Sequence, residues 1–189
     1  MICCPLRELK PIQKIMNKSR LSLLTVMILA ATAARLIPHP PNFSPIAAMA
    51  LFGGAAFADK RAAFLMPLAG LFLSDLVLGF YTITPVVYGS FAVIVCLGLW
   101  VRRRRSAGRI AGAAVMGGLL FFVITNFAVW AMGHLYPQTL AGLVACYVAA
   151  IPFFQNTLLS NLFYSALLFG GLALAENRFV TLREEAVAA

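Results

Sequence analysis

The chain has 189 residues, of which 62% are hydrophobic and 11% are charged. Soluble domains average about 45–50% apolar and about 25% charged residues, so this composition excludes an ordinary soluble globular protein. One membrane crossing takes roughly 20 apolar residues, so the length allows six short crossings and leaves no room for a soluble catalytic domain. The net charge is +9, and the lysines and arginines that produce it cluster at the ends of apolar segments. Such clustering is typical of membrane proteins that obey the positive-inside rule rather than of nucleic-acid-binding proteins.

Six apolar segments predict an all-α integral membrane protein with six transmembrane helices. In chain order they cover residues 21–38, 44–58, 62–81, 85–101, 110–134 and 155–175. A further apolar stretch, residues 140–154, is short for a crossing and contains Pro152, so it predicts a re-entrant or interfacial helix between the fifth and sixth spans. The expected organisation is a basic cytoplasmic tail (1–20), a six-helix membrane domain (21–175) and a cytoplasmic C-terminal tail (176–189).

The basic residues predict the orientation of these spans. They precede the first segment, separate the second from the third and the fourth from the fifth, and follow the sixth. With both termini in the cytoplasm, Arg35 alone of the 15 lysines and arginines lies outside. The positive-inside rule therefore favours this orientation. A seven-span arrangement would place Arg178 and Arg183 outside and is disfavoured.

The four cysteines form neither a disulfide framework nor a zinc-ligand spacing. Two are adjacent near the N-terminus (Cys3, Cys4), and Met16 is an alternative natural start that would remove both. Cys96 falls near the middle of the fourth span, and Cys146 lies in the stretch before the sixth. A thiol in such a place is either inert packing or, if its helix lines a cavity, a soft ligand for a transition metal.

Polar residues gather on the side that we expect to face outward, where they predict a ligand pocket. The candidates come from the loop after the first span and from the outer ends of the later spans: Arg35, His39, Asn42, Asp75, Tyr88, Ser90, Asn126 and Asn156. Plainer interpretations stand beside this one. Arg35 and Asp75 could neutralise each other as a structural pair, His39 could lie at the lipid headgroups, and the asparagines could join helices by hydrogen bonds.

The common catalytic motifs are missing from the sequence. It contains no Walker A, HExxH or GxSxG pattern, so a transporter is favoured over an enzyme. The missing Walker A motif also means that the chain does not drive ATP-powered uptake by itself. With one intramembrane carboxylate and no detectable inverted repeat, an ordinary secondary transporter would be undersized.

Three stretches resemble a bacterial membrane family related to the substrate-binding S-components of energy-coupling-factor (ECF) vitamin transporters. They are RLIPHPPNFSPIAAMALFGG (35–54), PLAGLFLSDL (67–76) and YVAAIPFFQNTLL (147–159). The resemblance covers about residues 30–170. Within this group, the size and pattern look most like the BtuM-like solitary cobalamin transporters of Gram-negative bacteria.

The resemblance implies six helices, cytoplasmic termini and uptake of vitamin B12 (cobalamin) across the bacterial inner membrane. It also implies a cysteine thiolate as axial ligand to the cobalt of the transported cobalamin, a role carried by position to Cys96, with Cys146 in reserve. Such coordination could exchange away a bound cyanide. The implied partners are membrane lipid and the vitamin, with an ECF ATPase module or without one, and no other cofactor or nucleic acid is implied.

Two other functions compete with cobalamin uptake. One is an S-component-like transporter of another vitamin or of a metal, which would need a separate ATPase module. The other is a structural membrane subunit, whose small-residue helix faces would bind a partner complex. A structural subunit would bind no small ligand and would tolerate changes at Asp75, Asn126 and Asn156.

The cobalamin interpretation predicts that Cys96→Ser weakens cobalamin binding and changes the cobalt absorbance spectrum, because the variant lacks the coordinating sulfur. The measurement is an absorbance spectrum of the detergent-purified protein from cells grown with cobalamin, with the variant beside it. An unchanged spectrum would remove Cys96 from this role and transfer it to Cys146.

Overall fold

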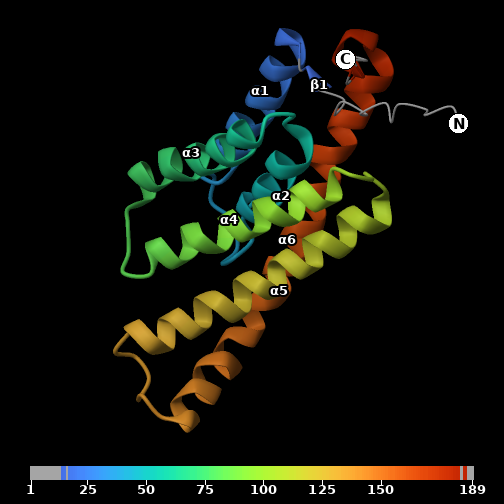
Figure 1. Ribbon diagram of the computed structural model, residues 1–189. Helices are drawn as coiled ribbons and strands as arrows, with labels where there is room; N and C mark the ends of the chain where they lie inside the picture. The colour runs from blue at the N-terminus through green and yellow to red at the C-terminus, as the bar shows by residue number, and fades with distance from the viewer. Residues whose placement is uncertain (1–13, 16, 184, 187–189) are drawn as a thin grey trace, which may run out of the picture.

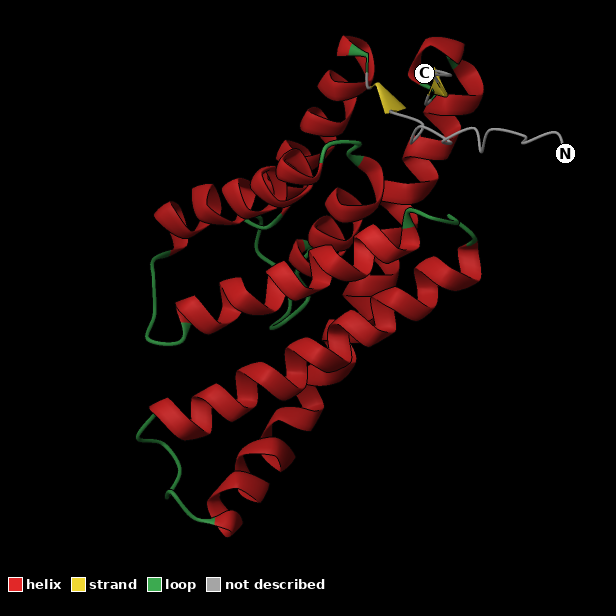
Figure 2. Ribbon diagram, in the orientation of Figure 1, coloured by secondary structure: helices red, strands yellow, loops and turns green. Residues whose placement is uncertain are grey.

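The computed structural model describes residues 14–15, 17–183 and 185–186, and it confirms an all-helical fold (Figures 1 and 2). The helices are α1 (Lys18–Ala34), α2 (Ile46–Ala56), α3 (Lys60–Leu78), α4 (Thr84–Val101), α5 (Ala107–Met132), α6 (Leu140–Arg178) and the 3-10 helix η1 (Val180–Leu182). Two-residue strands β1 (Lys14–Ile15) and β2 (Glu185–Ala186) pair antiparallel, so the two ends of the described chain lie together. Cys3, Cys4 and Met16 lie outside the described residues.

Helix α2 is the centre of the molecule, because all of its 11 residues are buried. A helix that is apolar on every side can be stable only where neighbours cover it completely. Its closest neighbour is α4, and glycines form the crossing. A Cβ atom on Gly54 would lie 2.2 Å from the carbonyl oxygen of Val95, and one on Gly98 would lie 2.3 Å from that of Leu51. The two backbones therefore touch, which only glycine permits.

Four helices, α3 to α6, are long and apolar enough to cross a membrane, and α2 is a shorter apolar helix. At 1.5 Å per residue, α2 is about 17 Å long, well short of the hydrocarbon thickness of about 30 Å. Large apolar side chains also face outward, with Leu174 72% and Val77 69% exposed. Such exposure is expected of a surface that contacts lipid. The structure is that of a membrane-embedded helical protein.

The separate helix predicted for residues 140–154 is wrong. This stretch is the first part of α6, a continuous helix of 39 residues that contains Pro152. Proline removes one backbone hydrogen bond and bends a helix, but the remaining hydrogen bonds on either side let it continue. Together with α5, the first half of α6 forms an antiparallel hairpin that extends beyond the other helices (Figure 1).

Arginines at the end of the molecule near the termini have structural partners. Arg20 of α1 is buried, with 1% of its side chain exposed, and Nη1 lies 2.6 Å from the Glu176 carboxylate of α6. Arg102 donates hydrogen bonds to the carbonyl oxygens of Phe57 and Ala58, just after α2, at 2.9 and 2.6 Å. Cations at a helix C-terminus satisfy carbonyls and complement the helix dipole. These arginines therefore stabilise the fold as well as indicating orientation.

The glycine crossing predicts a position-specific loss of stability. Gly98→Ala forces the backbones of α2 and α4 apart and should lower the free energy of unfolding by about 1–3 kcal/mol. Gly89→Ala is the matched control in the same helix, because a Cβ there meets nothing within 4 Å. The control should leave stability unchanged or raise it slightly. Thermal unfolding of the detergent-purified proteins measures the difference in stability. Equal stability of the two variants would contradict the close backbone contact between α2 and α4.

Candidate ligand-binding site

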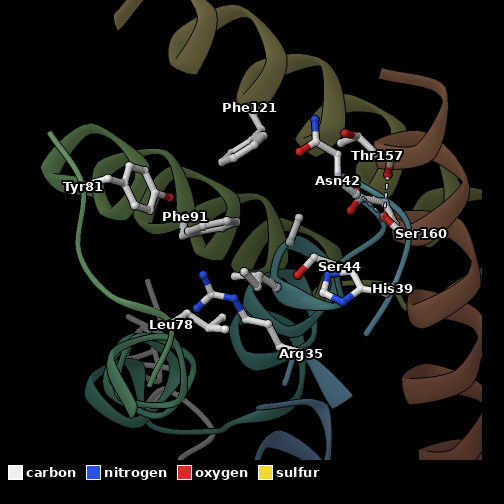
Figure 3. A pocket seen from close by; sticks show the side chains of 13 residues that line it. Arg35, His39, Asn42, Ser44, Leu78, Tyr81, Phe91, Phe121, Thr157 and Ser160 are labelled. Carbon is white, nitrogen blue, oxygen red and sulfur yellow. Dashed lines mark hydrogen bonds between the residues drawn. The ribbon is translucent and has the colours of Figure 1, made fainter. Parts of the chain in front are cut away.

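A cavity of about 240 Å³ lies at the opposite end of α2 from the arginines just described. Every helix from α1 to α6 contributes to its wall, either directly or through the residue that caps it. The lining residues are Arg35, His39, Asn42, Ser44, Ile46, Ala47, Leu78, Tyr81, Phe91, Phe121, Thr157, Ser160 and Asn161. Figure 3 shows ten of these side chains labelled around the space.

Arg35, the residue that ends α1, forms a buried ion pair with Asp75 of α3. Their closest nitrogen and oxygen atoms are 2.6 Å apart, and the side chains are 11% and 2% exposed. The Tyr88 hydroxyl donates a 2.8 Å hydrogen bond to the other oxygen of Asp75. Nη1 of Arg35 also donates to the hydroxyl of Ser74. A charge this deeply buried requires such partners, so Asp75 and Tyr88 fix the position of Arg35 in the cavity wall.

The loop between α1 and α2 closes one side of the cavity and is attached to α6. The side-chain amide of Asn156 donates to the carbonyl oxygen of Pro41 at 2.9 Å, and the Ser160 hydroxyl, which donates to the Thr157 carbonyl at 3.0 Å, also lies 3.5 Å from the carbonyl oxygen of Asn42. Asn42 has a φ of 61°, in the left-handed region where asparagine is enriched. The ring nitrogen Nδ1 of His39 lies 2.7 Å from the carbonyl oxygen of Ile37, so this nitrogen carries the proton.

Aromatic rings form the opposite wall. Phe91 of α4 and Phe121 of α5 stack with their centroids 5.2 Å apart and their planes at 25°. Tyr81, in the connection between α3 and α4, lies beside them in Figure 3. Burial, and next the negative charge of Asp75, raise the pKa of Tyr81 above its ordinary value of 10.0. Its phenol, which is protonated at neutral pH even at the ordinary pKa, can donate a hydrogen bond.

The structure brings some of the predicted site residues together and separates others. Arg35, His39 and Asn42 line the cavity, whereas Asp75 and Tyr88 lie behind Arg35. Asn156 holds the loop without lining the cavity. The others lie outside the cavity wall: Ser90 is bonded to its own helix, and Asn126 and Cys146 contact each other in the α5–α6 hairpin.

Cys96 is exposed on α4 and does not line the cavity. The buried face of α4 carries Phe91, Val95 and Gly98, which recur at the helical spacing of three to four residues. Cys96 is one residue beyond Val95 and therefore turns about 100° away from that face. Its depth along the helix could be predicted from the sequence, but the face that it occupies depends on the packing of α2.

Several lining residues were not among the predicted site residues. Phe91, Phe121 and Leu78 carry no polar group that would separate them from lipid-facing residues of the same type. Ser160 and Asn161 are polar residues of the predicted sixth span. They lie four and five residues after Asn156, a spacing that places all three near one face of a helix, and this spacing could have added them to the predicted site. Ser44 and Tyr81 are loop residues whose direction only the fold determines.

No three His, Cys, Asp or Glu side chains in the described part of the chain come together in a group that could hold a metal ion. The cavity instead offers hydrogen-bond donors, one guanidinium group and aromatic surface. This combination suits an organic solute with polar and apolar parts.

Comparison with known proteins gives one match. Residues 15–185 match a family whose description is a family of unknown function, DUF6580. Neither a curated protein nor a solved structure matches the chain.

The buried ion pair predicts that Asp75→Asn is strongly destabilising. The variant leaves the Arg35 guanidinium buried without a countercharge, which should lower the free energy of unfolding by about 3–5 kcal/mol. Asp59→Asn is the matched control, because Asp59 is an exposed N-cap and asparagine caps a helix equally well. Thermal unfolding of the three purified proteins makes the comparison. A loss at Asp75 no larger than at Asp59 would show that the pair does not support the fold.

Proposed function

We propose that this chain, which belongs to the DUF6580 family of unknown function, is a membrane-embedded solute-binding protein that takes up a small molecule. The cavity carries the proposal, because all six helices converge on it around a buried, positioned arginine. A structural subunit would have no need for an ion pair placed behind the wall of a cavity. The manner of uptake is that of S-components of ECF transporters, with a separate ATPase module or without one.

The proposed orientation places this cavity on the outer side of a bacterial inner membrane, with both termini in the cytoplasm. Two observations support it. The paired ends β1 and β2 lie together, as an even number of crossings requires. The clustered arginines 102–105 lie near those ends, whereas the cavity lies at the other end of α2. The positive-inside rule favours the arginine end as cytoplasmic.

Cobalamin uptake is the narrower form of this proposal, and its support is the resemblance of the three sequence stretches to solitary cobalamin transporters. Two features of the structure favour a solute smaller than cobalamin. Cys96 lies outside the cavity wall, so its sulfur does not reach a ligand bound there. A volume of about 240 Å³ is also below the 300–1,000 Å³ typical of sites for drug-sized ligands, and a corrinoid is larger than such ligands.

The test of solute binding is extraction and mass spectrometry of small molecules bound to the detergent-purified protein. We expect a bound solute in the original protein and much less in Ala47→Phe, because the new ring fills the cavity that Ala47 lines. The matched control is Ala33→Phe on the exposed face of α1, which should keep the solute. Gel filtration confirms that each variant is folded.

The same preparations decide the cobalamin question. Protein from cells grown with cobalamin should show no corrinoid absorbance band if the solute is smaller. A band that Cys96→Ser shifts or removes would instead establish cobalamin as the ligand.

Equal solute content in Ala47→Phe and the original protein would contradict the cavity as the binding site.

A further inference from the structure

The charge that faces the cavity is positive. Arg35 is the one lining residue with a permanent charge, and none of the thirteen lining residues is an aspartate or a glutamate. Asp75, which balances Arg35, lies behind it with 2% of its side chain exposed and is not part of the wall. The ion pair is therefore neutral as a whole but presents its cationic half to a ligand.

The guanidinium group of Arg35 makes its polar contacts to described residues from one nitrogen only. Its hydrogen bonds to Leu71 and Ser74 and its ion pair with Asp75 are all made by Nη1. Nε and Nη2 make no hydrogen bond to any described residue. Figure 3 shows the guanidinium group directed toward Phe91. Neighbouring N–H groups of arginine match the two oxygens of a carboxylate, which they bind side by side.

Two further donors in the wall lack partners among the described residues. The hydroxyl oxygen of Ser44 is buried and makes no hydrogen bond. The Tyr81 hydroxyl is protonated at neutral pH and makes no hydrogen bond to a described residue. The hydroxyls of Thr157 and Ser160 are different, since both already donate to backbone carbonyls of α6. A buried polar atom without a partner is rare in folded proteins, so the Ser44 hydroxyl calls for an explanation. Tyr81 is 49% exposed, and its hydroxyl is an accessible donor rather than a buried one.

The apolar part of the wall contains two aromatic rings. The stacked rings of Phe91 and Phe121 face the space together with Leu78, Ile46 and Ala47. Aromatic rings prefer other flat rings in offset or edge-to-face contact. The volume of about 240 Å³ limits the ligand to a small molecule.

We infer that the ligand of this cavity is a small organic anion with a carboxylate at one end and a flat apolar ring at the other. The inference rests on the proposed function and names its substrate class. The carboxylate binds Nε and Nη2 of Arg35 and accepts hydrogen bonds from Ser44 and Tyr81. The ring lies against Phe91 and Phe121. Asp75 holds the guanidinium group in place from behind the cavity wall.

The experiment compares matched acid and amide probes on the full-length protein in detergent. Benzoate is paired with benzamide, and naphthalene-2-carboxylate with its amide, so that each pair differs only in the charged group. Thermal stabilisation at increasing probe concentration gives the dissociation constants. We expect each acid to bind about tenfold or more tightly than its amide, because hydrogen bonds to an ionised group are stronger than neutral ones.

Variants separate the two ends of the ligand. Arg35→Lys keeps the charge next to Asp75 but loses the paired N–H groups, so the preference for acid over amide should fall severalfold. Ser44→Ala should reduce the same preference without disturbing the ion pair. Phe121→Leu should weaken acid and amide equally. Arg61→Lys, at an exposed position at the start of α3, is the control and should change neither.

Each outcome bears on a different claim. Equal binding of acids and amides, or a neutral or cationic molecule as the solute extracted from the purified protein, overturns the anion class and leaves the proposed solute-binding function standing. Binding by no probe together with no extracted solute overturns both. An acid preference that Arg35→Lys and Ser44→Ala leave intact places the anion elsewhere and also overturns the inference.

Discussion

The ion pair between Arg35 and Asp75 is the constraint around which the site is built. It joins the end of α1 to α3 at a point where both side chains are almost completely buried. Two charges in such surroundings are tolerated only in good geometry with further hydrogen bonds, and Ser74 and Tyr88 supply them. Because Tyr88 belongs to α4, three helices are fixed relative to one another by one pair of charges.

Helix α2 makes that arrangement possible. Its wholly apolar sequence is buried along its whole length, so the other helices must pack around it. The backbone contact at Gly54 and Gly98 brings α4 unusually close, and this contact sets how far Phe91 of α4 reaches into the cavity wall. The floor of the cavity, at Ile46 and Ala47, is the first turn of the same helix. A short helix that is unable to span a bilayer alone therefore organises those that can.

Much of this fold could be predicted from the sequence, and the exceptions have physical causes. Runs of apolar residues located the helices because hydrophobicity is a property of segments. The charged pair Arg35 and Asp75 was also visible, since charges in apolar segments are few. The unbroken α6 could not be predicted, because a proline ends some helices and only bends others. The outward direction of Cys96 depends on which face of α4 packs against α2, and this face cannot be predicted from the composition of the helix.

The two ends of the molecule use arginine in opposite ways. Near the termini, Arg102 donates from both of its terminal nitrogens to the backbone carbonyls of Phe57 and Ala58, so these donors serve the fold. At the cavity, Arg35 uses Nη1 for its ion pair and hydrogen bonds within the described structure, and its other two nitrogens make none there. Because Arg35 lines the cavity, these remaining N–H groups are available to a ligand. In the proposed function, a bound anion accepts hydrogen bonds from this side of Arg35 and from the buried, unpaired Ser44 hydroxyl.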